Sequence, residues 1–152
     1  MNKLFLKIVI SAAAGSLLSS SPMVAQESPS TPKAAHVQIT QGPEIEIAKE
    51  FLTIIRWTTN NPGGSPVHYG IVHYGTDPKN LSQIAKSPLR LDPSHPSIVF
   101  RVRMVGLKAG TTYYYTVGAE GSDGSVDKME STVKQFVIPV EPQQTSAQQP
   151  GP

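Results

Sequence analysis

Residues 106–118 read GLKAGTTYYYTVG and place three tyrosines in a row directly after a glycine-containing turn. Alternate side chains of a β-strand face opposite sides, so Tyr113 and Tyr115 share one face while Tyr114 lies on the other. A buried hydroxyl needs a partner, and a tyrosine just after a corner turn can bond back to the backbone of that corner. We therefore expect Tyr113 to be the corner tyrosine of a Greek-key sandwich, with Leu107 and Tyr115 in the core. The alternative interpretation is an exposed binding strip, mainly at Tyr114.

Short β-rich runs separated by turn signals make up the rest of the central region. The run at 97–107 alternates cleanly and places Arg101 and Arg103 on the face opposite to Phe100 and Val102. We see no capped amphipathic helical segment and no internal repeat. The sequence thus predicts an all-β fold, an immunoglobulin-like antiparallel β-sandwich of about seven strands. The expected strands are residues 36–48 with a break at Gly42-Pro43, 51–60, 67–75, 81–87, 97–107, 112–119 and 133–138.

The first 25 residues have the three-part pattern of a secretory signal peptide. Lys3 and Lys7 precede an apolar run at 8–18, which small and polar residues follow. We expect cleavage after Ala25, with Ser21 as a second candidate. A membrane anchor is the alternative, but the apolar run is short and serine-rich for a bilayer span. We therefore expect an exported protein, periplasmic or extracellular, with no membrane insertion once the signal is removed.

Charge and cysteine content argue against several kinds of binding and against stabilisation by disulfides. The chain has 13 Lys and Arg against 11 Asp and Glu, and loss of residues 1–25 removes Lys3 and Lys7, which leaves 11 against 11. Bulk charge therefore predicts no binding to nucleic acid or to an acidic membrane. The chain contains no cysteine, so the core alone must stabilise the domain, without disulfides.

The composition changes on both sides of the β-rich region. Residues 26–34 are polar and rich in proline and serine, which predicts a flexible leader. Residues 35–138 form the expected sandwich domain. Residues 139–152, PVEPQQTSAQQPGP, lack apolar periodicity and are predicted to be a disordered tail.

Several of these motifs carry a family resemblance. Leu107, Gly110 and Tyr113 resemble the corner of fibronectin type III domains, and Trp57 stands where that fold keeps its core tryptophan. The closest resemblance is to the N-terminal fibronectin-like domain of purple acid phosphatases, over about residues 36–138. Ala109 departs from the pattern, because a proline is usual there. The motifs that follow this branch in order are IRWTT (55–59), VHYGTDP (72–78), RMVGLKAGTTYYYTVG (103–118) and STVKQF (131–136).

The resemblance implies a non-catalytic domain. Purple acid phosphatases hydrolyse phosphate esters at a two-metal centre that Asp, Asn, His and Tyr side chains hold on a separate downstream α/β domain. The ligand motifs of that domain, Asp-x-Gly, Gly-Asp-x-x-Tyr, Gly-Asn-His and Gly-His-x-His, do not occur in this sequence. A two-metal site needs such clustered ligands. We therefore expect no enzyme activity, no catalytic residue, no metal and no cofactor.

The residues offer little other chemistry. His68 and His73 lie five positions apart in one predicted strand and so face opposite sides, which prevents joint chelation of one ion. His95 lies in a proline-rich loop near Asp92. We expect all four histidines, His36 included, to be solvated or to lie at sheet edges, with a chance surface metal site as the alternative. The chain has no Gly-x-Ser-x-Gly motif, and Gly63-Gly64 is not followed by the lysine and helix of a phosphate loop.

The leading hypothesis is an exported interaction module that binds a protein or a surface ligand. Its candidate contact residues are Arg101, Arg103, Tyr114 and His95, although a solvated polar face is the plainer interpretation. A second hypothesis is a phosphatase-associated domain, in which the partner is a separately encoded metallophosphatase. A third is a carbohydrate-binding module, which usually needs an exposed aromatic platform, whereas Trp57 is expected in the core.

Overall fold

The computed structural model describes residues 32–127, 129 and 131–142, and these residues form eight β-strands and no helix. No helix in this described part is long and apolar enough to cross a membrane. The expected signal peptide, most of the leader (26–31) and most of the tail (143–152) lie outside the described residues.

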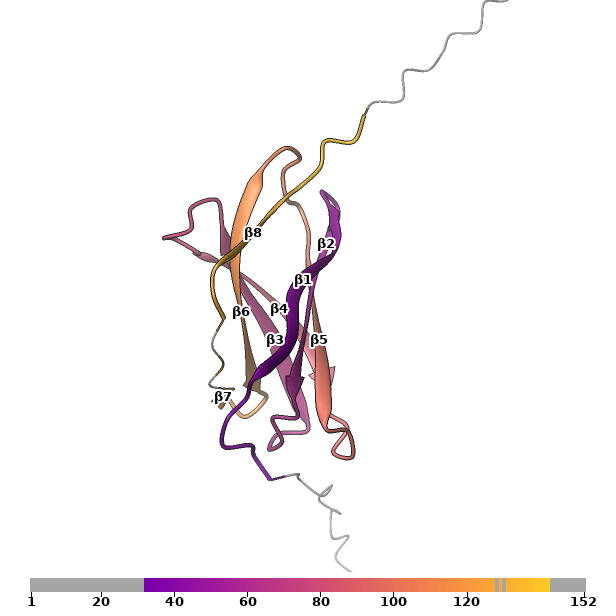
Figure 1. Cartoon of the computed structure of the whole chain (residues 1–152), viewed down its shortest axis with the longest axis vertical. Helices are drawn as coiled ribbons and strands as arrows, with labels where there is room; N and C mark the ends of the chain where they lie inside the picture. The colour runs from indigo at the N-terminus through magenta and orange to yellow at the C-terminus, as the bar shows by residue number, and fades with distance from the viewer. Residues whose placement is uncertain (1–31, 128, 130, 143–152) are drawn as a thin grey trace, which may run out of the picture.

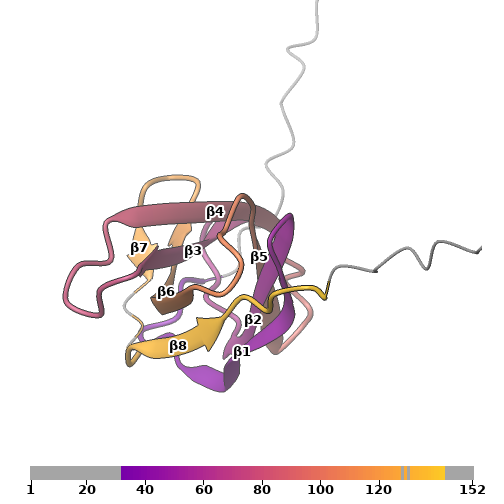
Figure 2. The same ribbon diagram turned by 90° about the horizontal axis from the view of Figure 1, so that it is seen from above.

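The strands form two antiparallel sheets, which confirms the predicted sandwich (Figure 1). The three-stranded sheet has the order β1-β2-β5, and the five-stranded sheet has the order β4-β3-β6-β7, with β8 also paired to β6. Seen from above, the two sheets wrap around a common interior (Figure 2). The strands are β1 (Ile39–Lys49), β2 (Leu52–Asn60), β3 (Val67–Gly75), β4 (Gln83–Arg90), β5 (Ser97–Met104), β6 (Thr112–Gly121), β7 (Val126–Asp127) and β8 (Lys134–Val137).

The core lies between the inner faces of the two sheets. Strand alternation brings Trp57 of β2 and Phe100 of β5 side by side, with ring centroids 5.2 Å apart and planes 18° apart. Gly70 of β3 makes room for this stack, because a Cβ at that position would lie 2.9 Å from Cγ2 of Val102 and 3.1 Å from Cδ1 of Phe100. Each of the four side chains expected in the core is at most 5% exposed: Trp57, Leu107, Tyr113 and Tyr115.

The hydroxyl group of Tyr113 is hydrogen-bonded to the backbone of the corner between β5 and β6. The backbone N–H of Lys108 donates to the hydroxyl oxygen of Tyr113 at 3.1 Å. The turn itself depends on Gly110, whose φ of 69° suits glycine, and the N–H of Gly110 donates to the carbonyl of Ile138 at 2.8 Å. The corner is thereby joined to the residues that follow β8.

The ends of several strands shift by up to three residues from the expected bounds, and three larger differences occur. β1 continues through Gly42-Pro43 where a break was expected, and its register with β2 shifts on both sides of that pair. The two-residue β7 was not predicted. Phe51 was expected to begin a strand but lies in the turn between β1 and β2, because Lys49 pairs directly with Leu52.

Candidate functional site

The sandwich has two different ends along its long axis (Figure 1). We call one the corner end: it carries the β1–β2 turn, the β5–β6 corner and the segment 139–142. We call the other the loop end: it carries the loops 61–66 and 91–96, the turn 122–125 and the N-terminal segment 32–38. The described chain therefore enters at the loop end and leaves at the corner end.

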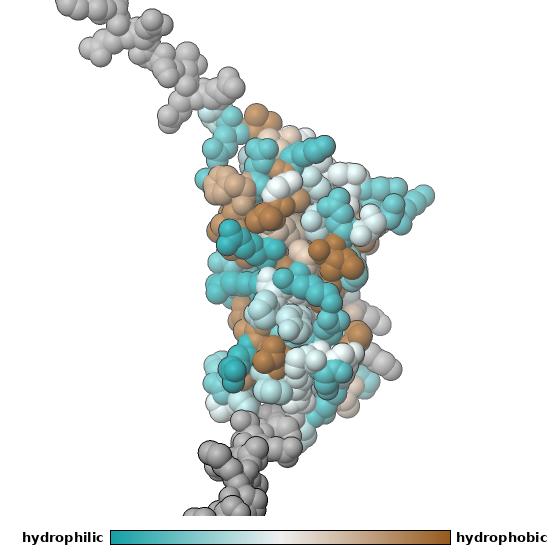
Figure 3. Space-filling view, turned by 180° about the vertical axis from the view of Figure 1, so that it is seen from behind, coloured by the Kyte–Doolittle hydropathy of each residue, from teal (hydrophilic) through white to brown (hydrophobic). Residues whose placement is uncertain are grey.

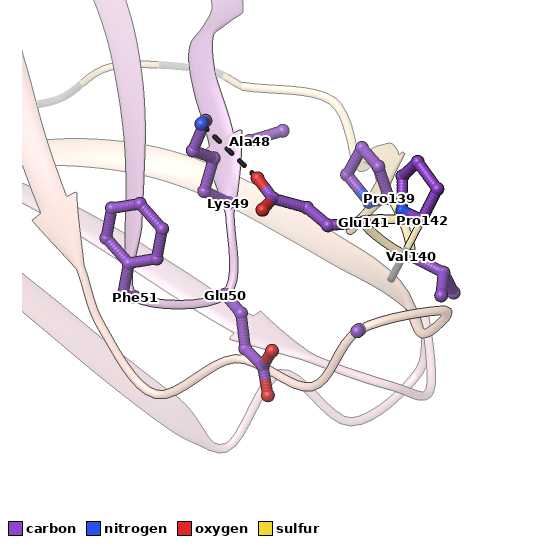
Figure 4. A pocket seen from close by; sticks show the side chains of 9 residues that line it. Ala48, Lys49, Glu50, Phe51, Pro139, Val140, Glu141 and Pro142 are labelled. Atoms are coloured by element: carbon purple, nitrogen blue, oxygen red, sulfur yellow. Dashed lines mark ion pairs between the residues drawn. The ribbon is translucent and has the colours of Figure 1, made fainter. Parts of the chain in front are cut away.

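A hollow of about 640 Å³ opens at the corner end (Figure 4). One wall comes from the end of β1 and the β1–β2 turn, and the other from the segment that follows β8. We call it the corner hollow. It is lined by Ala48, Lys49, Glu50, Phe51, Ala109, Pro139, Val140, Glu141 and Pro142.

Phe51 is the aromatic residue of the corner hollow. A two-residue turn leaves no position for its ring in the core, and Phe51 is 66% exposed. The ammonium of Lys49 lies 5.5 Å from the centroid of this ring. The same ammonium pairs with Oε1 of Glu141 at 3.3 Å, so that this ion pair connects the two walls (Figure 4). Both partners of this ion pair are exposed, so it contributes little to stability.

Backbone hydrogen bonds hold the walls of the hollow in place. The N–H of Leu107 donates to the carbonyl of Glu50 at 3.2 Å, which ties the β1–β2 turn to the corner. The N–H of Ile138 donates to the carbonyl of Thr111 at 3.1 Å, which ties the exit segment to the same corner. The hollow is thus a fixed, mostly apolar surface with charged groups at its edge. Such a surface can receive an apolar side chain of a partner.

The structure separates the four residues that were predicted to form an interaction surface. Arg101 and Arg103 are exposed on the three-stranded sheet, and Nε of Arg101 donates to Oε2 of Glu46 at 2.8 Å. Tyr114 belongs to β6 of the other sheet, half-buried beside a shallow hollow of about 470 Å³ with Pro78 and Val133. His95 is exposed at the loop end. These residues lie on three surfaces and do not make one site.

One face of the sandwich can be inspected for apolar surface in the view from behind. Figure 3 shows separate apolar patches surrounded by hydrophilic side chains on that face. A broad apolar face would indicate a permanent interface, whereas separate patches are typical of a monomer surface. The face seen in Figure 3 therefore carries no broad apolar surface that would be a stronger candidate site than the corner hollow.

The perturbed ionisable groups have structural causes. Burial, followed by the charge of Glu44, raises the pKa of Tyr115 to about 12. Hydrogen bonds from the side chain and backbone of Ser94 lower the pKa of Asp92, as those of Ser125 do for Asp123. These two aspartates organise tight turns at the loop end. No group of three metal-ligating side chains occurs within residues 32–127, 129 and 131–142.

The expectation that the histidines are solvated or lie at sheet edges is wrong for His68, which is fully buried at the loop end. Its ring contacts the carboxylate of Asp127 in β7, a residue that the sequence interpretation did not single out. The turn at 122–125 is followed by the short strand β7, which pairs with β6 and returns Asp127 to the interior.

Sequence reasoning also missed the corner hollow. The sequence does contain one indication of it: Phe51 is apolar although it follows Glu50 at a turn, where residues are usually polar. An apolar side chain that a short turn keeps outside the core is a candidate contact residue. The second wall comes from residues 139–142, which were predicted to be tail. No periodicity in that stretch indicates where it lies.

Comparisons with known proteins give one family match. The model of the family "Purple acid Phosphatase, N-terminal domain" matches residues 32–137. Among solved structures, the sensor domain of the anti-sigma factor RsgI4 of Pseudobacteroides cellulosolvens is similar at 16% identity and a TM-score of 0.45; the match covers 73% of this chain and 96% of that one. No curated protein matches the chain.

Proposed function

The chain belongs to the purple acid phosphatase N-terminal domain family, and we propose that it is a non-catalytic module that binds a protein partner at the corner hollow. The observation that supports this proposal most is the exposed ring of Phe51 at a fixed hollow. Solvent-facing aromatic side chains beside a pocket are typical contact residues of protein interfaces. The charged groups at the edge, Lys49, Glu50 and Glu141, would orient the partner.

A photo-crosslinking experiment tests where the partner binds. A benzophenone amino acid replaces Phe51 in one variant and Val126 in a second variant. The two positions are matched in exposure, at 66% and 67%, but Val126 lies near the loop end. We expect a crosslinked partner protein from position 51 only. Equal crosslinking at both positions, or none at position 51, would contradict the proposed site.

An activity assay tests the non-catalytic role. The family matched is that of an N-terminal, non-catalytic domain, and the sequence lacks the ligand motifs of the phosphatase centre. We expect the purified protein, supplied with iron, zinc or manganese, to hydrolyse a chromogenic phosphate ester no faster than a buffer blank. Chelator-sensitive turnover that survives repurification would show the proposal to be wrong.

The family match favours one kind of partner as a second candidate function. In this second candidate function, the module is phosphatase-associated, and a separately encoded metallophosphatase binds at the corner hollow. The complex captured through position 51 would then hydrolyse phosphate esters in a metal-dependent way. A captured complex without such activity would contradict the phosphatase-associated role but not the proposal of an interaction module. A carbohydrate-binding role is less well supported, because Trp57 is buried and offers no platform.

The place of action is part of the same proposal. The pattern of residues 1–25 indicates export, so the mature protein would meet its partner outside the cytoplasm. Amino-terminal sequencing of the protein recovered from the periplasm or medium tests this. A start near Gln26 is expected, and an intact Met1 on a cytoplasmic protein would contradict it.

A further inference from the structure

The buried imidazole of His68 has no role in the proposed interaction and lies at the opposite end of the sandwich. Its side chain is fully enclosed, and each ring nitrogen has a polar neighbour. Nδ1 lies 2.9 Å from Oδ2 of Asp127, and Nε2 lies 3.1 Å from the carbonyl oxygen of Gly63. Both distances are those of hydrogen bonds.

The protons needed by these two contacts can be counted. A backbone carbonyl and an ionised carboxylate only accept, whereas a neutral imidazole has a single N–H to donate. Two geometries satisfy both contacts: an imidazolium beside a carboxylate, or a neutral ring beside a protonated Asp127. Either one holds one proton more than a neutral His68 with an ionised Asp127. The pair therefore binds this proton as a unit.

One further charged group reaches the buried pair. The ammonium of Lys33 lies 3.8 Å from Oδ1 of Asp127, and this oxygen has no hydrogen-bond partner among the described residues. Asp123, in the turn before β7, also interacts with Lys33. The ring thus contacts Asp127, Lys33 contacts the far oxygen of Asp127, and Asp123 acts only through Lys33.

The ring joins three separate segments of the chain. Gly63 belongs to the 61–66 loop, and Asp127 belongs to β7. The N-terminal segment lies against the same loop, because the N–H of Ala34 donates to the carbonyl of Pro62 at 2.7 Å. Contact there is close: a Cβ on Gly63 would lie 2.0 Å from the carbonyl oxygen of Pro32.

We propose that His68, Asp127 and the carbonyl of Gly63 form a proton-operated latch that fastens the N-terminal segment and the 61–66 loop to the sandwich. When the pair gives up its extra proton, one ring nitrogen presents a lone pair to an oxygen, and that contact becomes repulsive. The 61–66 loop then loses its buried anchor, and Ala34 loses its position on Pro62. Raising the pH opens the latch and lowering it closes the latch.

The pH dependence of unfolding tests the latch. The folded state binds one proton more than the unfolded state over the pH range of opening, so stability decreases as the pH rises. We expect the unfolding constant of the wild-type protein to increase by up to about tenfold per pH unit in that range. His68→Gln should lack this component, whereas His73→Gln, which changes an exposed histidine of the same strand, should keep it. An equal pH dependence in the wild type and His68→Gln would overturn the proposal.

A second measurement does not depend on a variant that folds. Nitrogen-15 NMR of the wild-type protein at pH 6 reports whether each nitrogen of the His68 ring carries a proton, or whether Asp127 carries it instead. The extra proton on the pair supports the latch, and a neutral ring beside an ionised Asp127 overturns it. Exchange of the Ala34 amide should then accelerate with pH more than exchange of the Gly110 amide at the corner end, beyond the ordinary base catalysis that both share. Equal acceleration of the two amides would contradict release of the N-terminal segment.

Discussion

The two ends of the sandwich are stabilised by different means. At the loop end a fully buried histidine and aspartate hold the 61–66 loop and β7 together. At the corner end the backbone and the hydroxyl of Tyr113 organise the turn, and the apolar ring of Phe51 stays outside the core. A buried hydrogen-bonded pair is costly to disrupt, whereas exposed apolar surface adds little to folding. The loop end is thus fastened by a buried polar pair, whereas the corner end leaves an aromatic ring in solvent.

The largest effect is expected from Asp127→Ala at the loop end. It leaves the enclosed ring of His68 without its charged partner and should cost about 3–5 kcal/mol of unfolding free energy, because one member of a buried pair remains. Chemical denaturation measures the loss. Asp123→Ala is the control, since Asp123 is an exposed aspartate of the same end and should show a clearly smaller change. Similar losses in both variants would mean that the buried pair does not anchor the loop end.

A smaller effect is expected from Tyr113→Phe at the corner end. The variant keeps the ring in the core but leaves the N–H of Lys108 without its acceptor, which should cost about 1–3 kcal/mol. Tyr114→Phe removes the hydroxyl of the half-buried neighbour and should cost about 0.5 kcal/mol or less. Denaturation of the two variants side by side gives the difference. A greater loss for Tyr114→Phe would contradict the role of the Tyr113 hydroxyl.

The sequence predicted the corner end better than the loop end, and there is a physical reason. Strand parity and the glycine turn are local, so 106–118 alone indicates which tyrosine faces inward. The pairing of His68 with Asp127 joins residues 59 positions apart and depends on a two-residue strand that no periodicity indicates. The corner hollow was missed for a similar reason, because its second wall is proline-rich and has no pattern.

Shortening the chain at each end gives the next comparison. Ending it at Pro139 removes the exposed Lys49–Glu141 ion pair and should change the melting temperature by about 2 °C or less. Starting the chain at Ala35 removes the residues before it, and with them the Ala34–Pro62 hydrogen bond and the Lys33–Asp127 contact. That loss, of about 1 kcal/mol, should lower the melting temperature by about 4 °C or more. Thermal unfolding of both shortened chains measures the two shifts, and equal shifts would mean that the N-terminal segment is not fastened more firmly than the exit segment.

The smallest effect on stability is expected from Phe51→Ala. The ring is two-thirds exposed, so its removal leaves no cavity and should cost about 0.5 kcal/mol or less. Val126→Ala provides the matched control of equal exposure near the loop end. The two variants should therefore unfold alike in denaturant, while only Phe51→Ala loses the partner that crosslinks through position 51. A loss above 1 kcal/mol for Phe51→Ala alone would show that the ring supports the corner itself. The corner hollow would then be part of the fold, and its exposed aromatic would no longer argue for a partner.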